Sequence, residues 1–217
     1  MQEVFVDASF HLSATQAIPL DHGYGLFAGI SRALPTLHHD AERWSVLPIR
    51  GLNRHDHTLS ITEDSRLTIR LPSDEISRVL PLAGKQLDIQ GKRVLVGIPE
   101  LHMLNPAQEL CARYVTIKGA ETREDFRASF EKQLTALLGD TLEHVLLHIG
   151  ARRVMQIKRY TVIGYTVGLS GLTEEQSILV QQRGFGGKRK MGAGVFLPQP
   201  VESLMQDMPG LEEEGRV

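Results

Sequence analysis

The same succession of elements occurs twice along the chain, and this repetition limits the fold more than any other feature. Residues 65–84 and 160–184 each show a strand of alternating or β-branched residues, a polar helix start, one amphipathic helix and a glycine stop. Thr173 with Gln176 fits a capping box, and Ser73 supplies an N-cap to the earlier helix. Two copies of one strand–helix pattern indicate a duplicated α+β architecture.

The segments that precede each copy also match. The pattern predicts strands at 2–12, 109–118 and 153–158, helices at 22–34 and 122–138, and a hairpin at 84–98 that turns at Gln90 and Gly91. The order strand, helix, strand, strand, helix, strand, repeated twice, is that of two tandem ferredoxin-like (β-α-β-β-α-β) units. The predicted domains are 1–100 and 107–198, divided within 99–106, with a tail at 199–217. The alternative is one mixed α+β domain whose strand–helix pairs resemble each other by chance.

A glycine-rich basic segment runs from Gly184 to Gly194 with the sequence GFGGKRKMGAG. Glycine allows a close backbone approach and a positive φ, and successive exposed N–H groups can form an anion-binding concavity. Lys188, Arg189 and Lys190 add positive charge, which favours a phosphate-rich ligand. The segment lacks the spacing of a dinucleotide fingerprint or a P-loop. The alternative is a glycine-rich hairpin with a solvated basic turn.

Composition narrows the function classes. The formal net charge of -2 gives no global basic field, so any nucleic-acid binding must come from local patches. Cys111 is the only cysteine, which excludes a disulfide framework and a cysteine-based zinc site. No apolar run has the length of a membrane span, and the first residues lack the pattern of a signal peptide. We therefore expect a soluble, cytoplasmic protein.

Tandem ferredoxin-like units with a C-terminal Gly–hydrophobic–Gly loop resemble the RAMP superfamily of CRISPR-associated RNA-binding proteins. The resemblance is closer to its repeat-processing endoribonucleases, in particular the MYXAN subtype. It covers roughly residues 3 to 198 and is carried by the stretches 18–34, 65–72, 81–85, 114–119 and 184–196. The glycine loop is shared across the superfamily and marks RNA binding, whereas the first helix with its histidines separates nucleases from non-catalytic relatives.

The resemblance implies metal-independent cleavage of a CRISPR repeat RNA. The 2′-hydroxyl attacks the adjacent phosphate and leaves a 2′,3′-cyclic phosphate and a 5′-hydroxyl. Such a reaction needs a base for the hydroxyl, an acid for the leaving 5′-oxygen and cations at the phosphorane. The resemblance implies no cofactor and no metal ion. The partners it implies are the repeat RNA (pre-crRNA) and, as further candidates, other subunits of a CRISPR effector complex.

Histidine suits the acid and base roles because its ordinary pKa lies close to working pH. The resemblance favours His38 as the catalytic histidine, then His22, then His39. A straight helix rises about 1.5 Å per residue, so His22 and His38 should lie roughly 20 Å or more apart and should not serve one phosphate together. The alternative for His22 is an exposed helix-start residue, or one whose ring bonds a loop carbonyl. His55 and His57 suggest a solvated turn rather than a metal cluster.

The partner of the catalytic histidine varies in this family among tyrosine, serine and lysine. Tyr24 and Ser31 on the first helix are candidates, and Lys158 is the better candidate to meet the scissile phosphate. The alternative for Lys158 is an exposed strand lysine. The candidate RNA-binding residues are Arg152, Arg153, Arg159, Gly184, Phe185, Gly186, Gly187, Lys188, Arg189, Lys190, Gly192 and Gly194, with Phe185 and Trp44 as weak candidates for base stacking.

Three functions compete at this point. The first is a repeat-specific endoribonuclease, and the second is a non-catalytic RAMP subunit that holds guide RNA in an effector complex. The third is a two-domain ferredoxin-like protein that binds a small phosphorylated ligand. Only the first predicts cleavage that a single histidine substitution abolishes.

Overall fold

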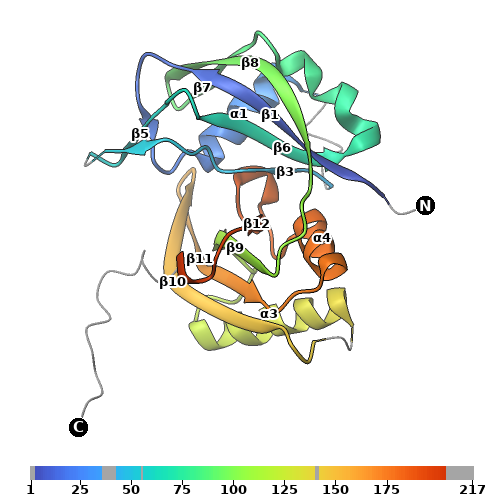
Figure 1. The fold of residues 1–217 in the computed structure, drawn as a ribbon. Helices are drawn as coiled ribbons and strands as arrows, with labels where there is room; N and C mark the ends of the chain where they lie inside the picture. Colours follow the sequence, from blue (N-terminus) through green and yellow to red (C-terminus); the bar gives the residue numbers. More distant parts are fainter. Residues whose placement is uncertain (1–2, 36–42, 55, 140–141, 204–217) are drawn as a thin grey trace. The chain divides into compact units, whose positions relative to one another are not determined.

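The chain divides into two compact units in a computed structural model that describes residues 3–35, 43–54, 56–139 and 142–203 (Figure 1). The first unit comprises Met1–Leu104, Met155–Thr161 and Lys188–Gly192. The second unit comprises Asn105–Val154, Val162–Gly187 and Ala193–Val217. After leaving the first unit the chain therefore contributes to it twice more, which a division at one linker does not anticipate.

The first unit is built on a five-stranded sheet with the order β3–β6–β1–β8–β7. Its strands are β1 (Phe5–Ser13), β3 (Ser45–Val46), β6 (Arg66–Pro72), β7 (Gln86–Ile89) and β8 (Lys92–Met103). The central strand β1 pairs antiparallel with both β6 and β8, and α1 (Gly23–Ala33) follows it in the chain. Strands β1, β3, β6 and β8 thus take the 2-3-1-4 order of a ferredoxin-like unit, with β7 added at one edge.

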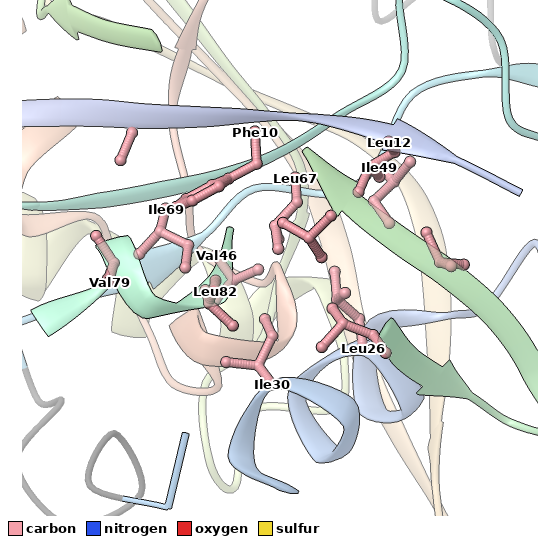
Figure 2. Close-up of a cluster of buried hydrophobic side chains, with 14 of the residues drawn as sticks. Phe10, Leu12, Leu26, Ile30, Val46, Ile49, Leu67, Ile69, Val79 and Leu82 are labelled. Carbon is pink, nitrogen blue, oxygen red and sulfur yellow. The ribbon is translucent and has the colours of Figure 1, made fainter. Parts of the chain in front are cut away.

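Successive side chains of a strand point to opposite faces of the sheet, so every second residue of β1 directs an apolar side chain into the core of this unit. Val6, Ala8, Phe10 and Leu12 of β1 are all buried, whereas His11 between them is exposed. Figure 2 shows Phe10 and Leu67 above Leu26 and Ile30, which lie four residues apart on α1 and therefore on one helix face. A small separate sheet joins β2 (Ile18–Pro19), β5 (Thr58–Ser60) and β4 (Leu52–Asn53).

The second unit has a four-stranded sheet with the order β10–β11–β9–β12. Its strands are β9 (Glu109–Val115), β10 (Leu146–Ile157), β11 (Tyr160–Ser170) and β12 (Leu197–Pro198), and its helices are α3 (Arg123–Leu138) and α4 (Glu174–Arg183). This is again the 2-3-1-4 order. The predicted α+β class with two tandem ferredoxin-like units is confirmed.

Local signals located most element ends correctly. The capping box of Thr173 and Gln176 is present at the start of α4, and Gly184 ends that helix at φ 59. Gln90 and Gly91 have φ of 52 and 82 between β7 and β8. Two successive positive φ values are what a type I′ two-residue hairpin turn requires.

One prediction about local structure was wrong. The helix expected after Ser73 is a pair of 3₁₀ helices, η1 (Ser73–Arg78) and η2 (Leu80–Leu82). Pro81, which has no N–H to donate, stops an α-helix from continuing through η2. The first unit's leading segment ends at Leu104, within the predicted range 99–106, although β8 occupies that range as far as Met103. Among the described residues, no helix is long and apolar enough to cross a membrane.

A buried ion pair joins the two central strands of the first unit. Asp7 of β1 lies directly opposite Arg70 of β6, and the guanidinium donates two hydrogen bonds of 2.8 Å to the carboxylate. The Arg70 side chain is only 2% exposed. A buried guanidinium that loses its carboxylate is a strongly unfavourable charge.

We expect Asp7→Ala to lower the free energy of unfolding by about 3 kcal/mol because it leaves the Arg70 charge buried without its carboxylate. The measurement is urea-induced unfolding of the full chain. Arg127→Ala is the matched control, since it removes an exposed helical ion pair with Glu131 that should contribute about 0.5 kcal/mol or less. Equal effects of the two substitutions would contradict the prediction.

The one cysteine is buried on β9. The Cys111 thiol is 2% exposed and donates to the Gln199 carbonyl at 3.3 Å. Burial, followed by the negative charge of Glu109, raises the pKa of this thiol to about 11.

The raised pKa predicts slow alkylation of Cys111 by iodoacetamide in the folded protein at pH values where a free thiol reacts readily. The folded state keeps a proton that the unfolded chain releases above about pH 8.5. The buried thiol therefore leaves the free energy of unfolding unchanged below that pH. The free energy of unfolding then falls as the pH rises to about 11. Alkylation rates followed by mass spectrometry at increasing pH, with urea-unfolded protein as the control, test this. Equal rates for folded and unfolded protein at pH 8.5 would contradict it.

Candidate functional site

Two segments distant in sequence pack against the start of α1 within the first unit. One is the tip of the β10–β11 hairpin, where the Gln156 backbone N–H donates to Asp21 Oδ2 at 2.8 Å. The other is the 3₁₀ turn η3 (Arg189–Met191), which contacts α1 and β3. The first turn of α1 therefore lies beside residues 155–161 and 188–192.

Gly23, the first residue of α1, permits this packing. A Cβ at this position would lie 2.3 Å from the Met191 carbonyl oxygen and 3.2 Å from Cε of Met155. The residue after Met191 is closely packed as well, because a Cβ on Gly192 would meet the Pro48 ring at 3.1 Å. Only glycine allows the backbone of η3 to approach α1 this closely.

These two segments, which pack against the start of α1, carry five cationic residues, and we call them the basic cluster. Its members are Lys158, Arg159, Lys188, Arg189 and Lys190. Within the part of the chain that the structure describes, Lys158, Lys188 and Lys190 form no ion pair. The first turn of α1 carries no acidic residue. The positive end of the helix dipole and these cations together favour an anion.

The backbone turns hold two of these cations outward. Lys158 is exposed at the two-residue tip between β10 and β11 with φ 55, and Lys188 precedes η3 with φ 64. At the same tip the Arg159 guanidinium stacks 5.1 Å from the Tyr160 ring centroid and donates to its hydroxyl at 3.0 Å. Lys158 keeps an exposed ammonium, whereas Arg159 is oriented by Tyr160.

The His22 side chain is buried and hydrogen-bonded within the protein, which indicates a structural role instead of the predicted catalytic one. Its side chain is 4% exposed, Nδ1 donates to the Pro19 carbonyl at 3.2 Å, and Nε2 accepts from the Ile49 N–H at 3.1 Å. With both ring nitrogens engaged, His22 has no free nitrogen for a substrate proton. The alternative of a ring that bonds a loop carbonyl is the one observed.

The two hydroxyl candidates on α1 differ in exposure. Tyr24 is partly exposed, and its hydroxyl has no hydrogen-bond partner among the described side chains and backbone. The Ser31 Oγ is buried and has no partner among the described atoms. A buried oxygen cannot reach an RNA phosphate, so Ser31 is unsuited to the catalytic role predicted for it. His38 and His39 lie outside the described residues.

The glycines of the loop serve packing and not the anion-binding concavity predicted from composition. Their backbone N–H groups already have acceptors inside the protein: Gly186 donates to Gln133 Oε1 at 3.0 Å, and Gly187 to the Thr116 carbonyl at 2.9 Å. Gly194 donates to the Tyr114 carbonyl at 2.7 Å, while the N–H groups of Gly184 and Gly192 end the preceding helices. The positive charge of the loop lies in the side chains of Lys188, which is exposed, and of Arg189 and Lys190, which are partly exposed.

Both aromatic candidates for base stacking are core residues. Phe185 is 3% exposed and packs between Phe130 and Phe196, with ring centroids at 4.7 and 5.5 Å. Trp44 is also buried, and its indole N–H donates to Glu75 at 2.7 Å. Sequence alone does not show burial, so neither Phe185 in the glycine loop nor Trp44 after the first helix was recognised as a core residue.

The other predicted cations lie on β10 in the second unit. Arg152 is exposed, and Arg153 is partly exposed and donates to Thr166 at 3.4 Å. Arg152 therefore remains available to a ligand, and Arg153 has an internal contact.

The residues that assemble the site were not found by sequence reasoning. They are Asp21, Pro48, Met155, Gln156 and Met191. A signal was present in the sequence, because Gly23, Gly25 and Gly29 all fall within one helix, where glycine is unfavourable unless something packs closely. A Cβ on Gly25 would lie 2.7 Å from Gln90, and one on Gly29 would lie 2.8 Å from the Asp88 carbonyl.

Comparison with known proteins identifies relatives over most of the chain. The family model described as Cas6 Crispr matches residues 6–200. The CRISPR-associated endonuclease Cas6 of Myxococcus xanthus (strain DK1622) is 37% identical over 195 residues, which are 90% of this chain and 82% of the relative.

Solved structures share the fold at low sequence identity. A Cas6-related protein from Pyrococcus furiosus superimposes with a TM-score of 0.62 at 12% identity, covering 92% of this chain and all of that one. An RAMP protein that binds different RNA substrates gives 0.60 at 12% identity, covering 89% and 98%. Thermus thermophilus Cse3 bound to an RNA representing a pre-cleavage complex gives 0.52 at 15% identity, covering 91% and 100%.

The chain shares its duplicated ferredoxin-like fold with these solved structures. The family match and the identity to the Myxococcus relative define it further: the chain belongs to the Cas6 family of CRISPR-associated endonucleases.

Gly23→Ala should displace η3, because its new methyl group would overlap the Met191 carbonyl, which cannot rotate away as a side chain could. We expect a loss of about 1–3 kcal/mol in the free energy of unfolding and faster trypsin cleavage after Lys188, Arg189 and Lys190. The measurements are urea unfolding and limited proteolysis. Gly187→Ala is the matched control, since a Cβ at that position would meet nothing within 4 Å. Unchanged proteolysis of Gly23→Ala would contradict the proposed packing role.

Proposed function

We propose that this chain cleaves CRISPR repeat RNA without a metal ion and thereby produces mature crRNA. The observation that carries the proposal is the 37% identity over 195 residues to a CRISPR-associated endonuclease Cas6. The basic cluster beside the start of α1 supports it, because a polyanion requires exposed cations, and the protein as a whole has a net charge of only -2.

In the proposed reaction a base removes the proton from the 2′-hydroxyl, whose oxygen attacks the adjacent phosphorus. The bond between phosphorus and the 5′-oxygen breaks, and an acid gives that oxygen a proton. The products are a 2′,3′-cyclic phosphate and a 5′-hydroxyl. General acid–base catalysis of this kind contributes about 10²–10⁴-fold in rate.

We assign the base to His38 on family placement, with His39 as the neighbouring candidate. Tyr24 is the hydroxyl of α1 best placed to contact the reacting phosphate, because it is partly exposed and has no described hydrogen-bond partner. Lys158 supplies a mobile ammonium to the phosphorane from the hairpin tip, which Asp21 holds at the start of α1. Lys188, Arg189 and Lys190 contact flanking phosphates in this proposal, and Arg152 contacts the repeat's backbone.

The test is cleavage of the repeat RNA of the host array in EDTA, with binding measured in parallel. We expect His38→Ala to lower the cleavage rate by about 10²-fold or more with RNA affinity retained. Lys158→Ala should lower the rate, whereas Lys85→Ala, an exposed lysine outside the basic cluster, should not. Replacing the 2′-hydroxyl at the cleaved nucleotide by hydrogen should abolish cleavage and preserve binding.

The control for folding is His22→Ala. It removes two internal hydrogen bonds, so any loss of activity should accompany a lower unfolding temperature. Cleavage that EDTA abolishes would contradict metal independence. Binding without cleavage by the wild-type protein would instead favour a subunit that holds guide RNA in an effector complex.

A further inference from the structure

One aromatic side chain lies exposed at the hairpin tip that carries Lys158 and Arg159. It belongs to Tyr160, the first residue of β11, which is 58% exposed. Every other aromatic residue in the described part of the chain is buried or only partly exposed. A planar ligand can therefore reach the ring of Tyr160, whereas the rings of Phe185 and Trp44 are covered by the core.

The Arg159 guanidinium lies against one face of this ring. Its Cζ atom is 5.1 Å from the ring centroid, and its Nη2 donates to the Tyr160 hydroxyl at 3.0 Å. No other ring in the described ranges stacks on Tyr160, so the second face of the ring is open. Arg159 thus orients the ring and adds positive charge beside it. A ring that is already oriented loses less conformational entropy when a ligand covers it.

Hydrogen bonds hold the backbone on both sides of the tip. The Gln156 N–H donates to Asp21 Oδ2 at 2.8 Å, which fixes the tip beside the start of α1. The Gln156 side-chain amide donates to the Thr161 hydroxyl at 2.8 Å and accepts from it at 3.2 Å. Thr161 directly follows Tyr160, so the strand end that carries the ring is fixed as well. The open ring face therefore has a defined position within the first unit.

The surroundings of the ring favour a nucleotide as its ligand. Sites for single-stranded nucleic acid combine cations, which follow the phosphates, with aromatic rings, which stack on the bases. Here Lys158 and Arg159 directly precede the ring, and the first turn of α1 carries no acidic residue. An apolar protein surface that covered the ring would also bury the exposed ammonium of Lys158, which is unfavourable. A base with an adjoining phosphate satisfies both groups.

We propose that Tyr160 stacks on the base of an RNA nucleotide that adjoins the reacting phosphate. This inference rests on the proposed function, in which Lys158 contacts that phosphate. The open face of the Tyr160 ring covers one face of the base, while Arg159 remains on the other side of the ring. Because stacking needs only a flat face, the contact fixes the position of the nucleotide without selecting its identity.

The spacing along the hairpin determines which base the ring reaches. Tyr160 is two residues from Lys158, and two residues of extended chain span about 7 Å at most. A phosphate held by Lys158 and a base held by Tyr160 therefore belong to the same nucleotide or to its immediate neighbour. The stacked base must also lack an RNA neighbour on one face, since the ring takes that place.

The test is the affinity of the full chain for repeat RNA with a 2′-deoxy sugar at the cleaved nucleotide, so that binding is measured without cleavage. We expect Tyr160→Ala to weaken binding by about fivefold or more, the effect of losing one base–aromatic stack. Tyr160→Phe keeps the ring and should bind within about twofold of the wild type. Leu146→Ala is the matched control, because Leu146 is a 60% exposed apolar residue of β10 in the second unit. It should bind like the wild type.

Removal of single bases locates the stacked nucleotide. A series of these RNAs, each with one abasic nucleotide beside the cleavage site, is bound to the wild type and to Tyr160→Ala. At the stacked position the abasic change should weaken binding by the wild type about fivefold or more and leave the affinity of Tyr160→Ala unchanged. Exchange of that base for another should have a smaller effect than its removal. Thermal unfolding of each variant checks that the fold is retained.

Equal affinities of Tyr160→Ala and the wild type would overturn the stacking proposal. So would an abasic effect that Tyr160→Ala leaves undiminished at every nucleotide beside the cleavage site, because another group would then hold the base. Either result leaves the proposed function intact if the wild type cleaves unmodified repeat RNA. A wild type that binds the RNA without cleaving it contradicts the proposed function alone, since the affinities still decide the stack. A wild type that binds no repeat RNA overturns both.

Discussion

The candidate site depends on the close approach of two backbones at Gly23. The Met191 carbonyl occupies the space where any other residue at position 23 would carry its Cβ. Through this approach η3 and the β10–β11 hairpin tip contact α1, and Asp21 fixes the tip by a backbone hydrogen bond. The basic cluster therefore has its position from contacts that involve none of its own charges.

The glycine loop shows why glycine content alone does not identify an anion site. A nest of N–H groups binds an anion only where those groups lack other acceptors. Here Gly186, Gly187 and Gly194 donate to acceptors within the second unit. Gly186 and Gly194 permit close approach to Thr116 and to Phe185, whose carbonyls would lie 2.2 and 2.0 Å from a Cβ. The glycines of the loop thus position the basic turn, whose positive charge lies in lysine and arginine side chains.

Whether the prediction for a site residue agreed with the structure depended on whether the fold buries that residue. Lys158 and Lys188 are exposed as expected, because a charged residue at a tight turn rarely finds an internal partner. His22, Ser31 and Phe185 were assigned to the surface from their chain positions, and the fold buries the reacting atom or the whole side chain of each. Burial depends on which distant segment covers a residue. For His22 the ring is held by Pro19 and Ile49, a pairing that neither helix periodicity nor spacing reveals.

The sequence by itself determined most of the long strands and helices, the capping box at Thr173, the turn at Gln90 and Gly91, and the tandem ferredoxin-like class. These features rest on interactions between residues a few positions apart, which the order of residues specifies directly. Only the tertiary structure decided that Met155–Thr161 and Lys188–Gly192 belong with α1 and that β8 extends beyond β7. Those outcomes rest on contacts between residues up to about 170 positions apart, whose free energy depends on complementary shape and on the loss of chain entropy when distant segments meet.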